Sequence, residues 1–144
     1  MPFSALDVAK YIIAYEHSKQ RQVSNLRLQK LLYFVQAKAI LETDELCFSD
    51  EMQAWDFGPV VPKVYHAYKI FGSWDIKAGD TEQKFDEVTE SYTRDILDYC
   101  SSYPTFQLVE ITHKQAPWKN AYRKGFKNTI TEQALKEYFK KSER

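Results

Sequence analysis

Hydrophobic side chains recur every three or four positions through most of the chain, which predicts a mainly α-helical protein. The strongest stripe covers residues 26–42, where apolar side chains surround most of the predicted helix. A helix that is apolar on nearly all sides is typical of a central, buried element. We therefore expect this helix, preceded by Ser24 and Asn25, to lie in the middle of the fold.

The same periodicity predicts further helices, and capping residues or prolines mark where they start. The predicted helices begin after Ser4 (to about residue 19), at Pro59 (to Gly72), after Thr81 or Asp86 (to Ser101), after Thr105, at Pro117 (to Gly125) and after Thr131. The helix that ends at Ser101 has an apolar line through Phe85, Val88, Tyr92, Ile96 and Tyr99.

Residues 54–72 combine a short strand, a sharp corner and a helix. Trp55 and Phe57 occupy alternate positions, as on a half-buried strand. Gly58 provides a flexible backbone at the corner, and Pro59 suits the first helical position because it lacks an N–H.

The remaining extended segments are short. We expect residues 46–48 to pair with residues 53–57, and residues 128–130 to form a brief extended piece. In the polar loop over 73–80, Trp74 and Ile76 are expected to anchor the chain to the core. The predicted fold is a single compact, mainly α domain over residues 1–144, with about six to seven helices and a two- or three-stranded β element.

Composition changes this picture little. The 144 residues carry no net charge, and 15% of them are aromatic. This aromatic content favours large rings at the surface, where they contact other proteins, over rings that are all buried in the core. From Lys119 onwards, however, eight basic residues stand against three acidic ones, a net of +5. A solvated basic face is the favoured interpretation; the alternative is a nucleic-acid-binding regulator that uses this C-terminal region.

No catalytic or metal-binding pattern is present in the sequence. Cys47, Cys100 and the three histidines lack metal-ligand spacing, and no nucleophile elbow or phosphate-binding loop occurs. His113 is expected to form capping hydrogen bonds; the competing hypothesis is a small enzyme that uses His113 and a nearby acid. We expect a cytoplasmic protein without metal, cofactor, membrane span or enzymatic activity.

Three motifs together resemble the Panacea domain, the family of SocA-like antitoxins and phage-associated GepA-like proteins. They are L-R-L-Q-K-L-L-Y-F-V-Q (26–36), A-W-D-F-G-P-V-V-P-K-V-Y-H-A-Y (54–68) and L-V-E-I-T-H-K-Q-A-P-W-K-N-A-Y (108–122). The resemblance extends from Ser4 to about Phe139. The matching residues are Gln29, Lys30, Leu31, Tyr33, Phe34, Trp55, Gly58, Pro59, Val60, Tyr65, Tyr68, His113, Pro117 and Trp118.

The resemblance implies a bacterial or prophage protein that neutralises a small toxin encoded nearby. It also implies that the protein can act as a proteolytic adaptor for a AAA+ protease, and it does not specify an oligomeric state. Nucleic acid is a weaker candidate partner, because no recognition helix with polar readers on one face stands out. The candidate partner-binding residues are Trp55, Gly58, Pro59, Tyr65, Tyr68, His113 and Trp118.

Overall fold

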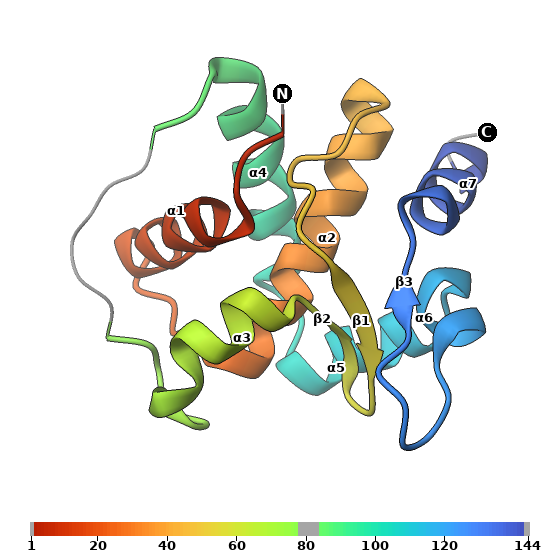
Figure 1. Ribbon diagram of the computed structural model, residues 1–144. Helices are drawn as coiled ribbons and strands as arrows, with labels where there is room; N and C mark the ends of the chain where they lie inside the picture. The colour runs from red at the N-terminus through yellow and green to blue at the C-terminus, as the bar shows by residue number, and fades with distance from the viewer. Residues whose placement is uncertain (1, 78–83, 143–144) are drawn as a thin grey trace.

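A long buried helix, α2 (Asn25–Thr43), forms the centre of the protein in a computed structural model that describes residues 2–77 and 84–142. Ser24 caps it by accepting a hydrogen bond from the backbone N–H of Arg27. The other elements surround α2, with α1 and α4 on one side and the sheet and α7 on the other (Figure 1). The sequence prediction of a central helix is confirmed.

Six further α-helices and one 3₁₀ helix complete the helical part of the described chain. Ser4 and Asp86 cap α1 and α4 as predicted, and each accepts a hydrogen bond from a backbone N–H three residues later. The elements are α1 (Ala5–Ser18), α3 (Pro62–Tyr68), η1 (Lys69–Phe71), α4 (Glu87–Cys100), α5 (Thr105–His113), α6 (Ala116–Ala121) and α7 (Glu132–Ser142).

A three-stranded antiparallel sheet lies against α2. Its strands are β1 (Met52–Trp55), β2 (Gly58–Val60) and β3 (Thr129–Ile130), in the order β2-β1-β3. Asp56 and Phe57 form the two-residue turn of the β1–β2 hairpin. The mainly helical fold with a small β element is therefore confirmed.

The predicted partner of the first strand was wrong. Residues 46–48 do not pair with β1; Phe48 instead forms a parallel bridge with Phe3 near the N-terminus. The chain reverses at Asp56 and Phe57, and Gly58 follows with a φ of +106°, which is unfavourable for other residues. The segment immediately after this turn, β2, is therefore the one that pairs with β1.

Pro59 was predicted to begin a helix, but it lies in β2 opposite Ala54. The first helical residue is Pro62, where a missing N–H is harmless. Pro59 is tolerated because β2 is an edge strand of the described sheet. Pro117 does lie in the first turn of α6, although that helix ends at Ala121, well before Gly125.

Burial corrects two predicted contacts. Ile76 is buried and its N–H bonds to the Val23 carbonyl, whereas Trp74 is 79% exposed. On α4 the predicted apolar line is displaced, since Val88 and Tyr99 are exposed. The buried face of α4 is instead made of Thr89, Tyr92, Thr93, Leu97 and Cys100.

Some predictions fall outside the described residues: the cap at Thr81, the end of the loop at 78–80, and the last two residues of the tail. Among the described helices, none combines the length and the apolar character needed to span a membrane.

Candidate functional site

A cleft of about 510 Å³ opens beside the tip of the β1–β2 hairpin. Four segments form its walls: the start of α2, the hairpin, α3 with the residues that follow it, and the loop between α6 and β3. Its volume falls in the range of ligand-binding pockets. The side chains that define it are Leu26, Gln29, Trp55, Phe57, Tyr65 and Lys127.

Trp55 and Tyr65 meet edge to face in this cleft, with ring centroids 4.9 Å apart. The Lys127 ammonium lies 4.5 Å from the centroid of the Trp55 ring, which is a cation–π contact. Trp55 also donates its indole N–H to Gln53 Oε1 at 2.9 Å. Both aromatic rings are half-buried, so each retains a surface that a ligand could cover.

Three phenylalanines protrude around the cleft and the hairpin. Phe57 is 59% exposed, Phe106 is 64% exposed and Phe126 is 67% exposed. The rings of Phe57 and Phe106 lie 6.5 Å apart and edge to face. We call Trp55, Phe57, Tyr65, Phe106 and Phe126 the aromatic face. A cluster of large apolar side chains exposed to solvent is typical of an interaction surface.

The amide side chains of α2 connect the cleft floor to the backbone. Gln29 is buried; its Oε1 accepts from the Val61 N–H at 2.9 Å, and its Nε2 donates to Asn25 Oδ1. Asn25 in turn donates from Nδ2 to the Tyr65 carbonyl at 3.0 Å. This chain of bonds fixes the start of α3, and with it Tyr65, relative to α2.

Lys30, the next residue of α2, bonds to the backbone of β2. It is fully buried, and its Nζ donates to the Pro59 carbonyl at 2.5 Å. Burial lowers the pKa of Lys30 to about 7. The lysine stem also passes close to Gly58, where an added Cβ would lie 3.1 Å from Lys30 Cε and 2.8 Å from Thr112 Oγ1.

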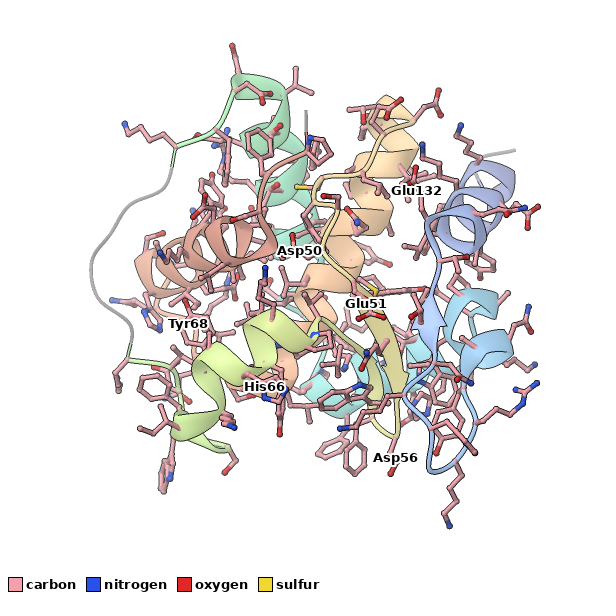
Figure 2. The ribbon with its side chains drawn as sticks, in the orientation of Figure 1. Asp50, Glu51, Asp56, His66, Tyr68 and Glu132 are labelled. Atoms are coloured by element: carbon pink, nitrogen blue, oxygen red, sulfur yellow. The ribbon has the colours of Figure 1, made fainter. Side chains whose placement is uncertain are left out.

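A column of three rings supports the other side of the hairpin. His113 stacks on Trp118 at 4.0 Å, and Trp118 stacks on Tyr122 at 4.5 Å. Trp118 donates its indole N–H to the Trp55 carbonyl at 2.8 Å, and the Tyr122 hydroxyl donates to Asp56 Oδ1 at 2.5 Å. Figure 2 shows Asp56 at the hairpin tip, so the bond from Tyr122 connects the column to the turn.

The seven predicted site residues thus occupy different environments. Trp55 and Tyr65 come together in the cleft. Gly58 and Pro59 are buried in β2, Tyr68 is 8% exposed in the core, and Trp118 is 9% exposed beneath the hairpin. His113 is half-buried next to Trp118.

Phe106, Phe126 and Lys127 were not predicted as surface candidates, and Phe57 was expected on a strand. The sequence around Phe126 indicated that its ring is exposed. Phe126 follows Gly125 in a polar, basic segment that offers few apolar neighbours for the ring to pack against. The order Asp56-Phe57-Gly58 could have indicated that Phe57 lies in a hairpin turn, because a two-residue turn is often accompanied by a glycine.

The described residues contain no group of three His, Cys, Asp or Glu side chains placed to hold a metal. Burial raises the pKa of Cys47 to about 11 and that of Cys100 to about 12, which disfavours the reactive thiolates. His113 has its pKa lowered, mainly by burial, and its Nε2 has no hydrogen-bond partner among the residues that the structure describes. His113 does not line the cleft.

The basic C-terminal region divides into two parts. On α7, Lys136 pairs with Glu132 at 3.1 Å, and Lys140 lies 3.9 Å from Asp44. Four more cations of this region, Lys119, Arg123, Lys124 and Lys127, belong to α6 and to the loop that carries Phe126. Positive charge is therefore concentrated beside the aromatic face rather than along α7.

Comparisons with known proteins agree with the three motifs. The family described as "Antitoxin SocA-like, Panacea domain" matches residues 28–119, which is more than half of the chain. Antitoxin SocA of Caulobacter vibrioides (strain NA1000 / CB15N) is 40% identical over 50 residues, which are 35% of this chain and 27% of that relative. The similarity to this relative therefore spans only about a quarter of its length. No solved structure matches. The family match confirms the resemblance: this chain belongs to the SocA-like antitoxin family that carries the Panacea domain.

Proposed function

We propose that this protein is a non-enzymatic antitoxin of the cytoplasm that neutralises a small protein toxin, encoded nearby, by binding it directly through the aromatic face. The observation that carries the proposal is the group of exposed phenylalanines around the cleft. Large aromatic side chains are preferred anchors at protein interfaces, and a few of them supply most of the binding energy.

The construction of the hairpin supports this role. Lys30 and Gln29 hold β2 and the residue after it from α2, and Trp118 and Tyr122 hold the turn from the opposite side. A surface that is rigid before it binds loses less conformational entropy on association. Among the seven candidate residues, Trp55 and Tyr65 would contact the toxin, and the other five would hold the fold in place.

Co-expression in bacteria with the neighbouring open reading frame tests the proposal. Growth should be restored by the unchanged chain and lost with Phe57→Ser or Phe126→Ser, and toxin affinity should fall about tenfold or more. Tyr99→Ser is the matched control, because Tyr99 is 62% exposed but lies on α4. A neighbour that is harmless alone, or lethal despite the unchanged chain, contradicts the proposal for that partner.

The fate of the toxin separates blocking from delivery to a protease. If the chain acts as an adaptor for a AAA+ protease, the toxin should disappear after translation is stopped, and a protease-deficient host should stabilise it. A toxin that persists at constant level while growth is restored indicates neutralisation by blocking alone.

A second candidate function is a nucleic-acid-binding regulator. It is favoured by the cations of the loop after α6, which lie next to exposed rings as in some single-strand binding surfaces. Binding to the promoter of its own operon should then weaken steeply as salt rises. Absence of binding at low salt removes this candidate.

A further inference from the structure

The outer edge of β2 is closed to strand addition, which limits how a partner can use the hairpin. Pro59 has no N–H, and its carbonyl already accepts from Lys30. The Val61 N–H that follows is bonded to Gln29 Oε1. An extended partner segment would find no free backbone groups along this edge, so recognition there must rely on side chains entering the cleft.

The floor of the cleft selects apolar side chains. Leu26, Trp55 and Tyr65 supply hydrophobic surface. The two amides at the floor, Asn25 and Gln29, have both their donor and their acceptor atoms engaged with each other or with the backbone. A polar group brought into the cleft would lose water without gaining an equivalent partner, which is unfavourable.

The rim of the cleft is positively charged. Lys69 and Lys127 line it, and within the described part of the chain neither lysine forms an ion pair with a carboxylate. Asp56 is the acid in the lining and accepts a hydrogen bond from the Tyr122 hydroxyl, so two lysines and one carboxylate leave the lining with a net charge of +1. An apolar floor beneath a cationic rim is complementary to an apolar side chain flanked by carboxylates.

We infer that the cleft recognises an acidic segment of the toxin: a large apolar side chain enters the cleft and packs against Leu26, Trp55 and Tyr65, and a neighbouring Asp or Glu pairs with Lys69 or Lys127. This inference rests on the proposed function for the identity of the partner. It defines the chemistry that the partner must present, because the cleft requires apolar and anionic groups close together.

Nuclear magnetic resonance with defined peptides tests the chemistry without the toxin. Blocked pentapeptides with a central phenylalanine are titrated into the ¹⁵N-labelled chain, with Glu, Gln or Lys at the four flanking positions. The Glu peptide should shift the Trp55 indole N–H signal and the Lys127 amide signal saturably, with an affinity about fivefold above that of the Gln peptide. The Lys peptide should bind more weakly than either.

Charge reversal supplies the matched variants. Combining Lys69→Glu with Lys127→Glu should abolish the preference for the Glu peptide and should reduce toxin affinity about tenfold. Lys84→Glu is the control, since Lys84 is exposed and adjoins Phe85, which packs on Phe3 and Tyr11. Unchanged melting temperatures show that all the variants fold.

The inference would be overturned by equal binding of the Glu and Gln peptides, by shifts confined to signals outside the cleft, or by full toxin neutralisation by the double charge reversal. Tighter binding of a ten-nucleotide oligothymidylate at the same signals would also overturn it, in favour of nucleic acid. The two proposals fail separately. Neutralisation without peptide selectivity removes only the cleft chemistry, whereas peptide selectivity without neutralisation removes only the antitoxin role.

Discussion

The ammonium of Lys30 lies 2.5 Å from the carbonyl oxygen of Pro59, which joins the central helix to the edge strand of the sheet. A fully buried lysine with a single carbonyl partner is unusual, because burial disfavours the charged form. The contact makes α2 the support of the hairpin on which the aromatic face is built. Both residues belong to the family motifs, and their positions explain them structurally.

Stability should depend on pH through Lys30. Burial holds its folded-state pKa at about 7, below the ordinary value of 10.5. Between pH 7 and 10.5 the unfolded chain binds more protons at this lysine, so its contribution to the free energy of unfolding rises with pH by at most about 1.4 kcal/mol per unit. Below pH 7 the lysine is protonated in both states, and its contribution becomes constant.

The measurement compares the unchanged chain with Lys30→Met by urea unfolding from pH 6 to 9.5. The difference in free energy of unfolding should stay constant at the acid end and then increasingly favour the unchanged chain. Titrating groups that do not interact with Lys30 cancel in this difference; the pKa of His113, which Lys30 lowers, changes with the substitution. A difference that does not vary with pH would show that Lys30 keeps its ordinary pKa.

Gly58→Ala should destabilise the protein by about 2 kcal/mol or more. The backbone has φ +106°, and the new Cβ would lie 2.8 Å from Thr112 Oγ1. Gly125→Ala is the matched control, since Gly125 has φ +85° but nothing within 4 Å of its Cβ position. Chemical denaturation should give a larger loss at position 58; equal losses would show that backbone conformation alone sets the cost.

Trp118→Phe should cost about 1 kcal/mol of stability while toxin neutralisation is retained. The substitution preserves an aromatic ring for stacking but removes the N–H that bonds to the Trp55 carbonyl at 2.8 Å. Trp55→Leu should have the reverse profile, with weaker toxin binding and a smaller change in melting temperature. Loss of neutralisation by folded Trp118→Phe would place Trp118 in the contact surface.

The two cysteines should react slowly with a thiol reagent such as Ellman's reagent. Both are buried, and burial raises the pKa of Cys47 to about 11 and that of Cys100 to about 12. Fewer thiolates at neutral pH and restricted access both slow the reaction. Full reaction is expected only in denaturant; rapid modification of the native chain at pH 7.5 would contradict the burial of these side chains.

Local sequence signals determined most of the helices and the family. Ser4, Ser24 and Asp86 mark helix starts because a short polar side chain can accept a bond from the backbone two or three residues ahead. The hydrophobic periodicity of the sequence likewise predicted α2. This periodicity depends only on residues three or four positions apart, which are close in the chain.

Tertiary structure decided the strand pairing and the cleft. β1 joins β2 next to it and β3 more than 70 residues away, and no local pattern encodes the second pairing. Pro59 satisfies the rules for a helix start as well as those for an edge strand, and the choice depends on Lys30 and Gln29 of α2. The cleft likewise gathers Leu26, Trp55 and Lys127 from three distant segments, because packing around α2 brings them together.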